Sequence, residues 1–131
     1  MPGLIDLHTH IYEHSTNLGV NPTTISARSG STVLVDAGSS GAGNFIGLKH
    51  YIMDPSRPLK IFAFLNISYA GIFAHSEKVR VGECHQMQLL NIDECARVCL
   101  ENLDSIVGVK VRVGSMYGKG IEPLDLALAA A

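Results

Sequence analysis

Apolar, strand-like tracts alternate with helix-like tracts along the chain, and this alternation restricts the fold more than any other feature of the sequence. Such an order predicts an α/β domain with a parallel sheet and right-handed crossovers. Both a doubly wound sheet and a barrel satisfy it. The apolar tracts predict strands over residues 3–10, 32–36, 60–66 and 106–113.

Helix signals fall between these strands. Residues 22–29 follow a potential N-cap, Asn21, begin with proline and end before Gly30. A second helix is predicted after a Gly- and Ser-rich turn at residues 37–44, and it is expected to end before Asp54 and its following proline.

The strongest helix signal follows a long, aperiodic segment at residues 67–90. Asn91 and Glu94 form a capping-box pattern. A last helical tract is predicted over residues 124–131. The capped helix is expected to bury one apolar stripe, made of Ile92, Cys95, Ala96, Cys99, Leu100 and Leu103.

Composition limits the classes of partner. With 131 residues and 47% apolar side chains, the chain is long enough for one domain with a core. Ten basic residues against twelve acidic ones leave no basic excess, so we expect no nucleic-acid partner. No run of 18 apolar residues is present, which predicts no membrane span. An odd count of three cysteines fits a reducing compartment, and we expect a cytoplasmic protein.

Two histidines lie at the end of the first predicted strand. Side chains alternate between the two faces of a strand, so Asp6, His8 and His10 share one face. Imidazoles at positions i and i+2 converge on one point and form a potential pair of metal ligands. A solvent-facing strand end would have the same pattern, so both interpretations stay open at this point.

The fourth predicted strand has valine at alternate positions on one face, with Lys110 and Arg112 on the other. Burial of an ammonium group is unfavourable and favours the neutral amine. A neutral lysine reacts with carbon dioxide to give a carbamate, an anionic oxygen ligand able to bridge two metal ions. An ion pair between Lys110 and an aspartate inside the sheet is the alternative.

Other polar residues have weaker signals. Arg112 is a candidate for binding a substrate carboxylate, while an internal ion pair with Asp6 or Asp36 explains it equally well. His14 is interpreted as a surface residue. His75 and His85 lie in the long segment and are candidates for substrate recognition. The glycine-rich turn lacks both phosphate-loop spacings, so a phosphate-binding, doubly wound domain is only a distant alternative.

Several stretches resemble the amidohydrolase superfamily over nearly the whole chain. They are PGLIDLHTH, VDAGSSGAGNF, LNISYAGIF and VGVKVRVG, with PLDLAL after them. The resemblance is greatest to the metallo-dependent deacetylases related to dihydroorotases and hydantoinases. It implies that residues 1–131 form the first half of a (β/α)₈ TIM-type barrel, with four βα units. The second half-barrel and the small β-sandwich of the family are expected to be absent from this chain.

The resemblance also implies a function. It predicts a fragment of a metal-dependent hydrolase that cleaves an amide or ester bond in a small acylated substrate with a metal-bound hydroxide. The implied cofactor is zinc, as one or two divalent ions. His8 and His10 would bind the more buried ion, and carbamylated Lys110 would bridge both. Two further histidines and the proton-shuttling aspartate are expected beyond Ala131.

Two alternatives follow from the missing half of the barrel. One is a catalytically incomplete half-barrel or assembly module without activity of its own. The other concerns partners: besides the small-molecule substrate, exposed parallel edges lead us to expect a homo-oligomer, because unpaired strands invite pairing with another chain.

Overall fold

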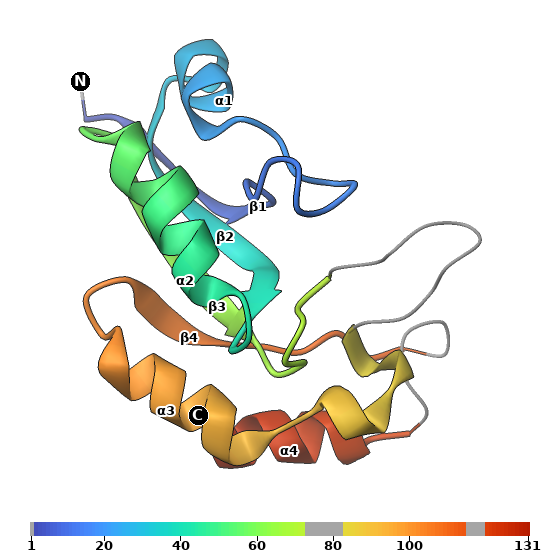
Figure 1. The fold of residues 1–131 in the computed structure, drawn as a ribbon. Helices are drawn as coiled ribbons and strands as arrows, with labels where there is room; N and C mark the ends of the chain where they lie inside the picture. Colours follow the sequence, from blue (N-terminus) through green and yellow to red (C-terminus); the bar gives the residue numbers. More distant parts are fainter. Residues whose placement is uncertain (1, 73–82, 115–119) are drawn as a thin grey trace.

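A computed structural model describes residues 2–72, 83–114 and 120–131 of the chain. Four parallel strands form one sheet in the order β1-β2-β3-β4 (Figure 1). The strands are β1 (Leu4–Thr9), β2 (Ser31–Gly41), β3 (Lys60–Asn66) and β4 (Ile106–Lys110). The α-helices are α1 (Pro22–Ser29), α2 (Phe45–Leu48), α3 (Ile92–Glu101) and α4 (Glu122–Ala130). The predicted α/β class with a parallel sheet is confirmed.

The sequential strand order decides between the two predicted architectures. A doubly wound sheet reverses its strand order at a switch point, whereas here each strand pairs with the next one along the chain. With right-handed crossovers, such an order places the connecting helices on one face of the sheet, as in a barrel. In Figure 1, α2 lies across the sheet, and α3 and α4 lie side by side near β4.

The hydrophobic core fills the space between the sheet and these helices. The core joins side chains from strands and helices far apart in sequence, among them Leu34, Phe45, Leu48, Ala63, Leu65, Cys95, Val98 and Ala127.

Within the described residues, no helix is both long and apolar enough to cross a membrane.

Local capping signals place the helix starts. The Asn21 side chain accepts a hydrogen bond from the Thr24 N–H at 3.1 Å, and α1 ends at Gly30 with φ of 73°. The Asn91 side chain likewise accepts from the Glu94 N–H at 2.8 Å at the start of α3. These side chains satisfy N–H groups that have no partner inside the helix. The predicted caps of both helices are therefore confirmed.

Strand β2 is longer than predicted. Residues 37–41, expected to belong to a turn, continue the strand: Ala37 pairs with Phe64 and Gly41 with Asn66, and the register is irregular between them. The Asn66 amide donates to the Gly38 carbonyl at 3.1 Å, and the Ser39 N–H donates to the Asp36 carboxylate at 2.6 Å. Polar side chains from the sheet itself thus hold an extended backbone in a segment whose composition is typical of a turn.

The helix after β2 does not end at Asp54. It continues from α2 through a π-helical turn at Lys49–Met53 and a 3₁₀ turn at Asp54–Ser56. Pro55 stands near the start of the 3₁₀ turn, where a residue without an N–H costs little. The predicted stop at the proline was therefore wrong by one short turn.

Both edges of the sheet leave apolar side chains exposed. Leu7 on β1 is 66% exposed and Val107 on β4 is 52% exposed.

The predicted apolar stripe of α3 is wrong in part, because Leu100 and Leu103 are exposed while Val98 is buried. The valine-rich strand ends at Lys110 instead of continuing to residue 113. As an edge strand, β4 is covered by neighbours less completely than a central strand.

Candidate functional site

The carboxyl ends of the four strands meet at one edge of the sheet, because all four strands are parallel. In barrels built from βα units, this edge holds the active site. The strands end here at Thr9, Gly41, Asn66 and Lys110. The predicted metal ligands lie at the ends of β1 and β4.

His8 and His10 lie next to each other. Their ring centroids are 5.5 Å apart, and the rings meet edge to face at 79°. His8 is exposed and His10 is half-buried. The structure thus brings the two imidazoles together, as the alternation along the strand predicted.

A hydrogen bond to Ser39 orients the His10 ring. The His10 Nδ1 atom lies 3.0 Å from the Ser39 Oγ atom. Burial lowers the pKa of His10, assisted by His8, Lys110 and Arg112, while the negative charge of Asp36 opposes this change. A lowered pKa keeps the imidazole neutral, which is the form that binds a metal ion.

Asp36 is a buried carboxylate that sequence reasoning considered only as an ion-pair partner. Its two oxygens accept from the Ser39 N–H at 2.6 Å and from the Ile11 N–H at 3.0 Å. Burial raises the pKa of Asp36, and these hydrogen bonds and the nearby His10 lower it. An acidic residue at the end of the apolar run TVLVD is the signal that indicates such a role, because charged groups are rarely buried without partners.

Lys110 passes directly over Gly38 in the neighbouring part of the sheet. A Cβ atom placed on Gly38 would lie 2.5 Å from the Lys110 Cγ atom and 2.8 Å from its Cβ atom. Lys110 is half-buried, not enclosed by valines as predicted, because β4 is an edge strand. Since Gly38 and Ser39 are consecutive, the lysine and His10 contact adjacent residues of β2.

Arg112 lies just beyond the end of β4 and forms an ion pair with Glu83. The Arg112 Nη1 atom is 3.5 Å from the Glu83 Oε2 atom, and the Glu83 side chain is buried. The sequence suggested Asp6 or Asp36 as the acidic partner and did not single out Glu83. Glu83 has φ of 47°, an uncommon value for a residue with a side chain. No local pattern in the sequence indicates this contact.

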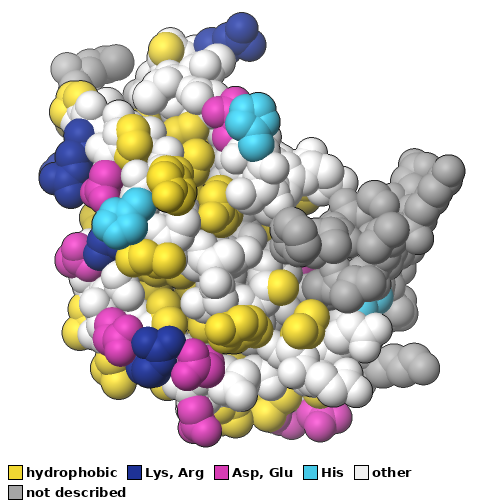
Figure 2. Space-filling view, in the orientation of Figure 1, with side chains coloured by type: hydrophobic (Ala, Val, Ile, Leu, Met, Phe, Trp, Pro, Cys, Tyr) yellow, Lys and Arg dark blue, Asp and Glu magenta, His cyan; other side chains and the backbone are white. Residues whose placement is uncertain are grey.

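Three further histidines, His14, His85 and His75, are outside the proposed ligand set. His14 is exposed, as predicted. His85 belongs to a short 3₁₀ turn, Glu83–His85, and is half-buried. His75 lies outside the described residues. On the face drawn in Figure 2, basic and acidic side chains are interspersed and do not form a basic patch.

The candidate site contains only some of the side chains that usually bind a divalent metal ion. Within residues 2–72, 83–114 and 120–131, no group of three His, Cys, Asp or Glu side chains could hold one. The candidate set has two imidazoles and a lysine instead, and Gly38 leaves room for the lysine side chain between the strands. This donor set fits zinc if the lysine provides an oxygen ligand as its carbamate.

Comparisons with known proteins identify deacetylases as similar to this chain. No family model matches the chain. The chain is 39% identical over 127 residues to a deacetylase of Agrobacterium fabrum, covering 95% of this chain and 30% of that protein. It is 37% identical over 127 residues to a deacetylase of Brucella anthropi, covering 95% of this chain and 31% of that protein. The chain thus spans about a third of the length of these relatives.

Solved structures show the same partial coverage. A dihydroorotase crystal structure superimposes with a TM-score of 0.90 and 38% identity, over 99% of this chain and 40% of that one. An adenine deaminase crystal structure gives a TM-score of 0.85 and 28% identity, over 98% of this chain and 33% of that one. The four βα units therefore match part of an amidohydrolase barrel. The chain is thus similar to part of these deacetylases and to part of the dihydroorotase and adenine deaminase structures.

Proposed function

We propose that this chain provides part of the metal centre of a hydrolase that cleaves an amide or ester bond in a small acylated molecule. The observation that carries the proposal is the close approach of the His8 and His10 rings at the carboxyl edge of a parallel sheet, with Lys110 near enough to lower the pKa of His10. The similarity to deacetylases supports the type of bond that is cleaved.

In this proposal the two histidines hold a zinc ion. His10 binds through Nε2, because its Nδ1 atom is engaged with Ser39. His8 lies beside it with its ring exposed at the same edge. When bound, a divalent ion supplies a nucleophile from water at neutral pH and polarises the carbonyl group under attack.

Lys110 contributes an anionic ligand after a covalent change. Its neutral amine attacks carbon dioxide, an N–C bond forms, and one proton leaves to solvent. The carbamate that results would offer two oxygens to a divalent ion. Gly38 leaves the space that the Lys110 Cβ and Cγ atoms occupy.

Arg112 is proposed to bind the substrate. Its guanidinium side chain is 37% exposed, and the buried Glu83 carboxylate holds it beside the site. A guanidinium group held in this way binds a carboxylate or carbonyl oxygen with directed N–H bonds. An acylated amino acid or a similar anionic molecule fits this requirement.

A second candidate function rests on the partial coverage of the relatives. Because the chain spans about a third of the deacetylases that it matches, it is also consistent with a module that binds metal but has no turnover. The two candidates differ in activity and agree on the metal ligands.

Metal analysis tests the proposed centre. Protein purified without chelator is expected to contain zinc, and the His8→Ala and His10→Ala variants are expected to lose it. His50→Ala is the matched control, since His50 is an exposed histidine on the helical segment after β2. Equal zinc contents in all four proteins would refute the metal centre. Hydrolysis of N-acetyl amino acids then separates an active enzyme from a module that binds zinc without turnover.

A further inference from the structure

Three polar residues connect the interior of the sheet to the metal-facing edge. Asp36 at the middle of β2 is fully buried, and so is Ser39 three residues later. The Ser39 N–H donates to the Asp36 carboxylate at 2.6 Å, and the Ser39 Oγ atom lies 3.0 Å from the His10 Nδ1 atom. His10 is thus connected to a buried carboxylate through one serine residue.

The donors around Asp36 determine the direction of these hydrogen bonds. Both carboxylate oxygens accept from backbone N–H groups, of Ser39 and of Ile11. The Ser39 hydroxyl is near enough to this carboxylate to lower the pKa of Asp36, and an ionised carboxylate can only accept. A hydroxyl group has a single proton. When that proton goes to Asp36, the Ser39 oxygen is left to accept from His10.

We propose that Ser39 is a positioning residue that fixes the tautomer of His10, with the proton on Nδ1 and the lone pair of Nε2 directed toward the metal centre. Metal-binding histidines are typically oriented by a hydrogen bond at the other ring nitrogen, which sets both the tautomer and the ring angle. The use of Nε2 as a ligand rests on the proposed function. The tautomer of His10 in the metal-free chain is independent of that function.

The backbone holds Ser39 in place for this role. Its carbonyl accepts from the Ile72 N–H at 3.3 Å, so the segment after β3 is tied to the end of β2. Gly71, with φ of 65°, brings its backbone so close that a Cβ atom would lie 2.4 Å from the same Ser39 carbonyl oxygen. These contacts restrict the movement of the hydroxyl group away from His10.

Ser40 provides a matched control. It is as buried as Ser39, and its hydroxyl has no hydrogen-bond partner among the described residues. A Ser40→Ala substitution therefore removes a buried hydroxyl from the same strand without breaking the connection between Asp36 and His10.

The experiment is ¹⁵N NMR of the metal-free chain labelled at histidine, at about pH 8 so that imidazoles are neutral. In the wild type, His10 is expected to be protonated at Nδ1. In Ser39→Ala it is expected to shift toward the Nε2–H form that free imidazole side chains prefer, whereas Ser40→Ala leaves it unchanged. Ser39→Thr keeps a hydroxyl and is expected to keep the Nδ1–H form.

Protonation of His10 at Nε2 in the wild type would overturn the inference, without recourse to any variant. A tautomer that is the same in Ser39→Ala and in the wild type would overturn it as well. This readout is separate from the proposed function. A wild-type chain with the Nδ1–H tautomer and no affinity for zinc would contradict the metal centre and leave the role of Ser39 intact.

Zinc affinity provides a second readout. In competition with a chromogenic chelator, Ser39→Ala is expected to bind zinc about 10- to 100-fold more weakly than the wild type. Ser40→Ala is expected to stay within about 2-fold of it, since no hydrogen bond is removed. Equal losses in both variants would indicate a general packing effect and would contradict a specific role for Ser39.

Discussion

Gly38 combines a positive φ with a close side-chain contact in the candidate site. Its φ of 84° is unfavourable for residues with a side chain, and Lys110 occupies the space where a Cβ atom would lie. Gly30 has a similar φ of 73° but nothing within 4 Å of such an atom. Substitutions at these two glycines therefore separate the energetic cost of a positive φ from the cost of a steric contact.

We predict that Gly38→Ala is more destabilising than Gly30→Ala. The control substitution is expected to lower the free energy of unfolding by about 1 kcal/mol, from the positive φ alone. The Gly38 variant is expected to lose a further ~2 kcal/mol, because the methyl group displaces Lys110. Urea denaturation measures both values. Equal losses would show that Lys110 moves aside without cost.

The cysteine pair on α3 leads to a second prediction at this scale. The interaction between the two thiols lowers the pKa of Cys99 and, together with burial, raises the pKa of Cys95, while burial raises the pKa of Cys84. The thiolate is the reactive form. Cys99 is therefore expected to react first with iodoacetamide, at a lower pH than the other two.

Mass spectrometry after brief alkylation identifies the modified cysteine. Cys95→Ala is expected to slow the reaction of Cys99 at neutral pH, because the hydrogen-bond donor is lost. Cys84→Ala is the control and is expected to leave that rate unchanged. First modification of Cys84 would contradict the prediction.

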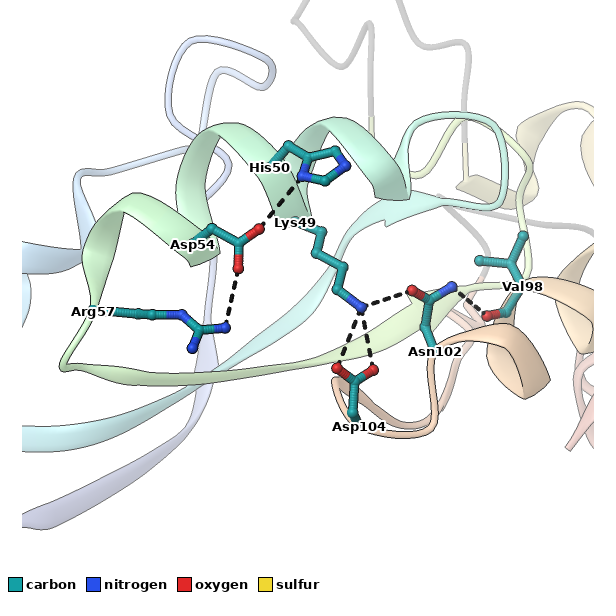
Figure 3. A network of polar contacts seen from close by, with 7 residues as sticks. All are labelled: Lys49, His50, Asp54, Arg57, Val98, Asn102 and Asp104. Carbon is teal, nitrogen blue, oxygen red and sulfur yellow. Dashed lines mark hydrogen bonds and ion pairs between the residues drawn. The ribbon is translucent and has the colours of Figure 1, made fainter.

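At the scale of elements, one lysine joins the helical segment after β2 to the turn between α3 and β4 (Figure 3). The Lys49 Nζ atom donates to the Asn102 side chain at 3.0 Å and pairs with Asp104 at 3.2 Å. The Asn102 amide in turn donates to the Val98 carbonyl at 3.0 Å, near the end of α3. The bridge thus connects elements that are distant in sequence.

We predict that Lys49→Met lowers the free energy of unfolding by about 1 kcal/mol, through loss of the charged hydrogen bond to Asn102. Lys60→Met, at the exposed start of β3, serves as the control and is expected to change stability little. Thermal unfolding followed by circular dichroism compares the two. A Lys49→Met variant no less stable than Lys60→Met would show that the bridge contributes nothing to stability.

The same bridge predicts a dependence of stability on pH. The hydrogen bond from Lys49 lowers the pKa of Asp104 below the usual 3.8. A carboxyl group with a lowered pKa stabilises the fold at pH values above 3.8 and loses this contribution as the pH falls through its folded-state pKa. Asp104→Asn is therefore expected to be less stable than the wild type at pH 7 and equally stable well below pH 3.8. Chemical denaturation at both pH values measures the difference.

At the scale of the whole molecule, the sheet has two open edges with apolar side chains. On β1, Leu4, Ile5 and Leu7 are each more than 60% exposed, and Val107 on β4 is 52% exposed. Because all strands run in one direction, the β4 edge of one copy can pair in parallel with the β1 edge of another. Two copies related by a twofold axis would bury both pairs of edges.

We therefore predict that the chain self-associates at micromolar concentration, as measured by analytical ultracentrifugation. Leu7→Lys is expected to shift the equilibrium toward the monomer by placing a charge on the β1 edge. Leu18→Lys is the control, since Leu18 is an exposed leucine in the loop after β1. A wild-type chain that sediments as a single monomeric species would refute this prediction.

Much of the fold could be predicted from the sequence, because local interactions determine it. The predicted bounds of α1 and β3 coincide with those observed, because caps, a proline and an uninterrupted apolar run determine them within a few residues. The pairing of His8 with His10 was equally predictable, since it follows from alternation along one strand. The placement of Lys110 at the carboxyl edge of the sheet followed from the parallel strands.

Contacts between distant segments decided the rest. Residues 37–41 form a strand because their two ends, Ala37 and Gly41, pair with β3, although their composition is typical of a turn. Asp36 and Glu83 belong to the candidate site because the fold places them next to the distant residues Ile11 and Arg112. The chemistry of the candidate ligands was thus determined by residue type and strand period. Their orientation depends on hydrogen bonds that exist only when the whole sheet has formed.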